Sequence, residues 1–234
     1  MEPYFTAPLI IIEVIFSAMV LSALKNASTG KRVKKMLVFT LGIVLTLWLV
    51  SDYLMLSNGF FSATGFPQIA FATALATPII LGLLAQKFWQ PFTSAISNMS
   101  TANFLALQQM RAVFGVMFFF TASIPVWFQF IGGIGDIAAG IGAVFALRSF
   151  RKHPDKERQA IIKGNMMGIL DFVIVLNLGL FVVLRNESPD IMFDLIPLYV
   201  VPIFILLHIF SLQRLGSLNS QKIDNKREAS HENI

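Results

Sequence analysis

Residues 130–147 read FIGGIGDIAAGIGAVFAL and hold a single charged residue, Asp136. A helix needs about 20 mainly apolar residues to cross the hydrocarbon core of a bilayer, with a range of about 17–25. The stretch therefore predicts a membrane-spanning helix. Gly132, Asp136 and Gly140 lie four residues apart, so they share one face, where small residues let a neighbouring backbone approach closely. We expect Asp136 to be buried against another helix and not to face lipid.

Six further stretches are as long and as apolar as this one. They cover residues 5–24, 36–57, 68–85, 103–122, 161–184 and 191–212. The whole chain of 234 residues is 56% hydrophobic and 13% charged, whereas soluble domains are about 45–50% apolar and about 25% charged. The runs are too long and too evenly apolar for barrel strands. The sequence predicts an all-α polytopic membrane protein with seven transmembrane helices in residues 1–215. A disordered polar tail is expected at 216–234.

The basic residues indicate how the bundle is oriented. Lys and Arg cluster after the first run, after the fifth run and in the tail, and only Arg185 falls on the other side. The loops at 58–67 and 125–129 contain no charge. Because basic loops stay in the cytoplasm, we expect the N-terminus outside and the C-terminus in the cytoplasm. The net charge of +5 is then explained by the lipid bilayer, and no nucleic-acid partner is expected. The oligomeric state stays open, and a homo-oligomer is one alternative.

Several kinds of chemistry lack the residues they need. The chain has no Cys, which excludes disulfides, thiolate zinc sites, iron–sulfur clusters and a cysteine nucleophile. Of its three His residues only His208 lies in an apolar run, so a multi-histidine metal centre is not expected. No nucleotide-binding, serine-hydrolase or zinc-protease motif is present. No helix interior offers a lysine for a retinal Schiff base.

Three acidic residues are expected in the outer half of the membrane. Counting about 1.5 Å of rise per residue from the predicted outer helix ends places Glu13 roughly 12 Å deep, Asp52 roughly 8 Å and Asp136 roughly 9 Å. No Lys or Arg is predicted at that level. If the three acids converge, they form a site that binds protons or a cation. The alternative is that each one is a protonated or hydrogen-bonded packing group.

A second set of polar residues is expected in the inner half. Arg111 and Asp171 each lie roughly 10 Å from the inner end of their helix, and His208 lies roughly 9 Å from its own. A charge near the bilayer centre costs about 2.5–3.5 kcal/mol, so we expect an ion pair between Arg111 and Asp171. Gln108 shares a helix face with Arg111, and Asn165 adds an amide on the sixth run. Two interpretations are open: a clasp between helices, or a site in which Arg111 binds an anionic group and His208 titrates.

Three stretches together resemble a group of uncharacterised bacterial seven-helix membrane proteins, over roughly residues 100–215. The residues that carry the resemblance are Gln108-x-x-Arg111 with Pro125, Gly135-Asp136 and Gly140; Asn165 with Asp171; and Pro197-Leu-Tyr-Val-Val-Pro202 through His208 to Ser211-Leu212. The resemblance implies a location in the bacterial inner (cytoplasmic) membrane. It points to the same polar residues and implies no activity.

The sequence thus predicts an integral inner-membrane protein whose polar site binds or transports a small solute or protons. One alternative is an intramembrane enzyme or maturation factor for a lipid-soluble substrate, with His208 and Asp171 as an acid–base pair. Another is a non-catalytic sensor or assembly protein. The candidate binding residues are Glu13, Asp52, Gln108, Arg111, Asp136, Asn165, Asp171 and His208.

Overall fold

A computed structural model describes residues 6–28, 30–121, 124–179 and 194–231, with side chains up to residue 216. Throughout these ranges the chain forms helices and turns and no strand. Seven helical segments are long and apolar enough to cross a membrane, which confirms the predicted number of spans. The orientation of the bundle stays a prediction.

The first three spans are single helices, and so are the fifth and the sixth. They are α1 (Thr6–Ala27), α2 (Lys31–Ser57), α4 (Pro67–Phe88), α8 (Val126–Lys152) and α9 (Glu157–Leu178). The fourth span comprises α6 (Thr101–Gln108), α7 (Arg111–Met117) and the short η1 (Phe118–Phe120). The seventh begins with η4 (Ile196–Val200) and continues as α12 (Val201–His231). Three short helices connect these spans: α3 (Phe60–Ala63), α5 (Gln90–Asn98) and η2 (Pro154–Lys156).

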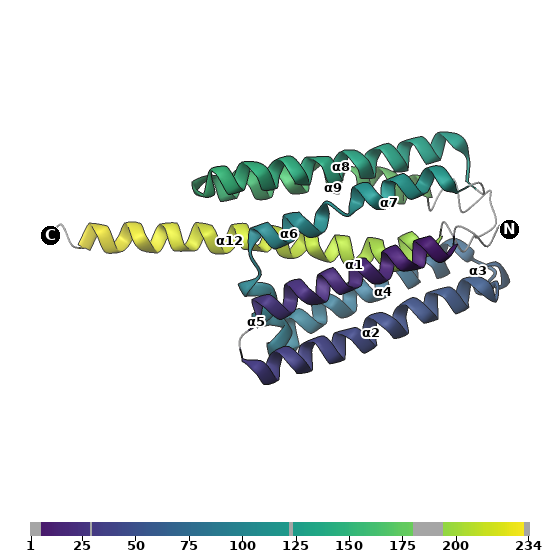
Figure 1. Cartoon of the computed structure of the whole chain (residues 1–234), viewed down its shortest axis with the longest axis horizontal. Coiled ribbons are helices and arrows are strands. Elements are labelled where there is room, and N and C mark those ends of the chain that lie inside the picture. The colour runs from purple at the N-terminus through teal and green to yellow at the C-terminus, as the bar shows by residue number, and fades with distance from the viewer. Residues whose placement is uncertain (1–5, 29, 122–123, 180–193, 232–234) are drawn as a thin grey trace.

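The long helices run along a common axis, with α12 in the middle (Figure 1). On one side of α12 lie α7, α8 and α9, and on the other side lie α1, α2 and α4 (Figure 1). Helix α12 packs against α4, α6 and α9, and so joins the two groups. The turn from α1 to α2 and the turn from α8 to α9 lie at one end of the bundle (Figure 1). We call it the basic end, because Lys and Arg flank both turns: Lys25, Lys31 and Arg32 at the first, and Arg151, Lys152 and Lys156 at the second. The opposite end holds α3 and η1 (Figure 1).

Glycines bring the backbones of α7 and α8 into contact. A Cβ atom on Gly115 would lie 2.7 Å from the Gly133 carbonyl oxygen and 2.8 Å from the Ile137 nitrogen. One on Gly140 would collide with Ala112. Asp136 lies between these contacts and is buried, as predicted from the spacing of its glycines. The close approach places this acid directly beside the first residue of α7.

The fourth span is broken where the sequence predicted a continuous helix. At Gln109 and Met110 the backbone tightens: the Met110 N–H donates to the Leu107 carbonyl at 3.1 Å, and the Ala112 N–H donates to the Gln109 carbonyl at 3.1 Å. Such bonds to the third preceding residue are typical of short 3₁₀ turns. The break ends α6 and makes Arg111 the first residue of α7.

The seventh span begins with a widened helical turn. Ile196–Val200 has the π-helical pattern; this turn contains Pro197 and is followed by Pro202, the second residue of α12. Pro202 has no N–H to donate to the carbonyl four residues before it. Widened turns are a common way to accommodate such a gap, and they occur frequently at functional sites.

Beyond the bundle, the backbone of α12 stays helical to His231 and projects past the other helices (Figure 1). Residues 203–231 contain no Pro and only one Gly, Gly216, so nothing in the sequence interrupts the helix. The disorder expected at 216–234 stays a prediction.

Candidate functional site

Arg111 is completely buried between α7, α8, α9 and α12, with 0% of its surface exposed. Its Nε donates to Asp136 Oδ1 at 2.7 Å, and its Nη2 lies 2.6 Å from the same oxygen. The same Nη2 donates to Asp171 Oδ2 at 2.5 Å. The predicted ion pair between Arg111 and Asp171 is therefore confirmed, and Asp136 joins it as a second carboxylate.

The remaining guanidinium nitrogen also has protein partners. Nη1 of Arg111 donates to the Gly168 carbonyl at 2.8 Å and lies 3.4 Å from His208 Nε2. The ring of Phe172 covers the guanidinium carbon at 3.8 Å, a favourable cation–π distance. Each nitrogen of the guanidinium is thus bonded within the protein. This saturation argues against the interpretation in which Arg111 binds an anionic ligand.

A chain of side chains extends from Arg111 through His208. The His208 Nδ1 lies 2.6 Å from Asn165 Oδ1, and Asn165 Nδ2 donates to Ser211 Oγ at 3.0 Å. Gln108 Nε2 also donates to Asn165 Oδ1, at 3.2 Å. Because an amide oxygen only accepts, the hydrogen of the imidazole must be on Nδ1. The Nε2 atom of His208 is then free to accept from Arg111.

The structure separates the three acids that we expected at one outer level. Asp136 belongs to the Arg111 cluster, while Glu13 and Asp52 lie together elsewhere in the bundle. The error came from the helix end: α8 begins at Val126, four residues before the predicted start of the run. Asp136 therefore lies about 15 Å along its helix, deep enough to reach Arg111.

Glu13 and Asp52 form a second buried acidic pair, between α1 and α2. Glu13 is 0% exposed, and its two carboxylate oxygens have no hydrogen-bond partner among the described residues. The two acids are close enough for their charges to interact. The side chain of Asp52 is hydrogen-bonded to that of Trp48, while the Oδ2 atom of Asp52 lacks a described partner. Nearby, the hydroxyls of Tyr199 and Ser17 are hydrogen-bonded at 2.6 Å.

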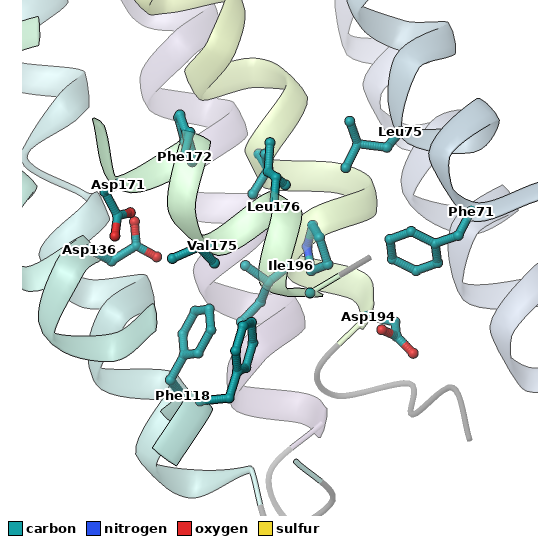
Figure 2. A pocket seen from close by; sticks show the side chains of 14 residues that line it. Phe71, Leu75, Phe118, Asp136, Asp171, Phe172, Val175, Leu176, Asp194 and Ile196 are labelled. Atoms are coloured by element: carbon teal, nitrogen blue, oxygen red, sulfur yellow. The ribbon is translucent and has the colours of Figure 1, made fainter. Parts of the chain in front are cut away.

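The carboxylates of Asp136 and Asp171 line a small cavity of about 40 Å³ between α4, α8, α9 and α12. Figure 2 shows the two carboxylates next to each other at one side of this cavity, with Asp194 at the other side. Phenylalanines and aliphatic side chains form most of the remaining wall (Figure 2). A water molecule needs about 10–15 Å³ of such space, so the cavity is large enough to hydrate the carboxylates.

Sequence reasoning missed several members of the cluster. Gly168 lies midway between Asn165 and Asp171, and Ser211 follows His208 by three residues. Both spacings put the residue on the face of a candidate that had already been identified. Phe172 and Asp194 gave no signal of this kind, because their roles depend on how the helices pack.

At the basic end, α12 carries a further polar contact one turn beyond Ser211. The Arg214 Nε donates to Glu157 Oε1 at 2.8 Å, and Arg214 Nη1 donates to the Met99 carbonyl at 3.2 Å. The Thr101 hydroxyl donates to the same Glu157 oxygen at 2.5 Å. Polar groups therefore recur along α12 from His208 to Arg214.

The fold and the cluster define a class of molecule: a multi-pass helical membrane protein built around a buried arginine with two carboxylates. The chain belongs to the family described as a domain of unknown function, DUF8737, whose model matches residues 68–216. This membership bears out the resemblance to an uncharacterised family. No curated protein and no solved structure matches the chain. The matched region includes the whole Arg111 cluster and excludes Glu13 and Asp52.

Proposed function

We propose that this chain is a multi-pass protein of the bacterial inner membrane that binds protons at Asp136 and Asp171 and moves them across the bilayer. One observation carries the proposal: a single buried guanidinium faces two carboxylates. With both acids ionised, the cluster has one excess negative charge. A buried charge of this kind is costly in a membrane, and one proton held by the pair removes it.

The cavity supports access to this proton. It connects the neighbourhood of Asp194 with the carboxylates of Asp136 and Asp171, and its volume suffices for hydration. On the other side of Arg111, hydrogen-bonding groups continue through His208, Asn165 and Ser211. Such a series of titratable and hydrogen-bonding groups is typical of proton pathways in pumps and transporters.

The geometry favours protons over an anionic solute. An anion would need free donors on Arg111, and the protein itself occupies them. The alternative of an acid–base pair made by His208 and Asp171 has weaker support, because each of these residues is bonded to Arg111.

The test is proton flux into proteoliposomes that contain a trapped pH-sensitive dye. A pH step should produce flux in liposomes with the wild-type chain, and Asp171→Asn and Asp136→Asn should reduce it to the level of protein-free liposomes. Asp155→Asn is the matched control, since it makes the same chemical change at an exposed residue outside the cluster. Elution as a single folded species must be shown for each variant.

Each outcome decides the proposal. Wild-type flux that Asp155→Asn retains and Asp171→Asn loses supports it, provided that replacing sodium by potassium leaves the rate unchanged. No flux from the wild-type chain overturns it. If Asp171→Asn keeps wild-type flux, the carboxylate pair is not the proton site. Loss of folded protein in both cluster variants, with no flux in the wild type, favours the sensor or assembly alternative.

A further inference from the structure

A second and much larger cavity lies away from the Arg111 cluster, between α1, α2, α4, α5 and α12. Its volume is about 860 Å³, within the range of about 300–1,000 Å³ that is usual for ligand pockets. Most of its wall is aliphatic or aromatic, none of the residues that line it is basic, and Asp52 is its one acidic residue. It shares no lining residue with the small cavity at Asp136 and Asp171.

This cavity reaches the lipid-facing surface of the bundle. Val44 of α2 and Leu81 of α4 both line it, and they are 50% and 59% exposed. At the end near α3, Phe60 lines it and is 48% exposed. A molecule dissolved in the bilayer can therefore enter from the side, between α2 and α4.

Asp52, the acid that lines this cavity, has a free acceptor atom among the described contacts. Asp52 is only 2% exposed, and its Oδ2 has no described hydrogen-bond partner. Glu13, whose charge interacts with that of Asp52, is fully buried, and neither of its carboxylate oxygens has a hydrogen-bond partner within the described part of the chain. Burying carboxylates without a counter-charge is unfavourable. A positively charged group arriving at Asp52 removes this penalty.

One aromatic ring lies close to the place where such a charge would lie. Trp48 lies one turn before Asp52 and lines the cavity, whereas Trp89 lines its other end, beside α5. The ring of Trp48 is 5.1 Å from that of Tyr199. Trp and Tyr rings attract cations through their faces. The wall thus combines an acid, aromatic rings and a long apolar surface.

We propose that this cavity binds a lipophilic amine from the bilayer. The protonated nitrogen pairs with Asp52, and the apolar chain lies between α2 and α4. The proposal uses none of the residues of the proton site and stands independently of it.

Tryptophan fluorescence offers a direct test in the full-length protein. The chain has three tryptophans, and Trp127→Phe leaves only Trp48 and Trp89, which both line the cavity. The probe is brominated dodecylamine, whose bromine quenches a ring that it touches; brominated dodecanol and brominated dodecanoate are the matched neutral and anionic probes. We expect half-maximal quenching by the amine at a concentration about tenfold lower than by the alcohol, as a charge-assisted bond to Asp52 implies.

Two variants in the Trp127→Phe background locate the binding. Asp52→Asn should remove the preference for the amine and leave quenching by the alcohol unchanged, while Asp155→Asn, the same change at an exposed site, should retain the preference. Ala74→Phe narrows the cavity and keeps the acid, and should weaken quenching by all three probes.

The proposal is overturned if amine and alcohol quench equally, if the alcohol or the carboxylate is preferred, or if Asp52→Asn keeps the amine preference. Should Asp52→Asn fail to fold, Ala74→Phe decides: undiminished amine quenching in that variant places the amine outside the cavity and overturns the proposal.

Discussion

The chain buries two pairs of carboxylates, one with a basic partner and one without such a partner among the described residues. Asp136 and Asp171 share Arg111, which is itself held by Gly168 and His208. The charges of Glu13 and Asp52 interact with each other, and neither acid forms an ion pair with a basic residue among the described residues. The first pair lies within the region that the family model matches, and the second lies outside it. The difference teaches that the protein itself can compensate the charge of a buried acid with a basic partner, whereas an acid without a counter-charge leaves that compensation to a ligand.

The largest effect should come from removing the shared partner. Arg111→Met leaves two buried carboxylates without a counter-charge, and we expect the free energy of unfolding to fall by about 3–5 kcal/mol. Unfolding in detergent, followed by circular dichroism, measures this. Arg148→Met is the matched control, because Arg148 is exposed and such surface changes stay within about 0.5 kcal/mol. Equal stability of the two variants would contradict the central role of Arg111.

A smaller loss is expected from crowding the same cluster. A Cβ atom on Gly168 would lie 2.6 Å from Arg111 Nη1 and 2.6 Å from His208 Nε2, so Gly168→Ala should cost about 1–3 kcal/mol. Gly142→Ala is the control, since nothing lies within 4 Å of a Cβ there. That change should be neutral or should stabilise by roughly 0.5–1 kcal/mol, as Ala favours helix. If Gly142→Ala lowered the stability more than Gly168→Ala, the cluster around Arg111 would have space for an additional methyl group.

The smallest effect is expected at the unpartnered pair. Glu13→Gln removes a carboxylate that has no described donor, so stability should stay unchanged or rise. Glu157→Gln, in contrast, weakens the half-exposed ion pair with Arg214 and should cost about 0.2–1 kcal/mol. Thermal unfolding of both variants in one detergent checks the ranking. If Glu13→Gln is the more destabilising, Glu13 has a partner and the contrast between the two pairs fails.

Hydropathy alone predicted the seven spans, because each run of about 20 apolar residues has no stable alternative in water. The ion pair between Arg111 and Asp171 was also predictable, since opposite charges at equal depth remove each other's cost of insertion. Both predictions hold even when a helix boundary is misplaced by a few residues, because the energies behind them change little with such a shift.

The assignment of Asp136 failed because it depended on such an error. Four residues at the start of α8 correspond to about 6 Å, enough to move the acid from one polar level to another. The break at Gln109–Met110 and the cation–π contact of Phe172 were equally invisible, because they arise from packing between helices. The large cavity beside Asp52 could not be foreseen either, since it is lined by residues from six separate helices.

The order of the partners along the chain has a consequence for biogenesis. Arg111 leaves the ribosome 25 residues before Asp136 and 60 residues before Asp171. Released alone into lipid, the fourth span would carry an uncompensated cation at a cost of about 2.5–3.5 kcal/mol. Entry of the fourth and fifth spans together would remove this cost, because Asp136 would then neutralise Arg111 within the hairpin that the two spans form.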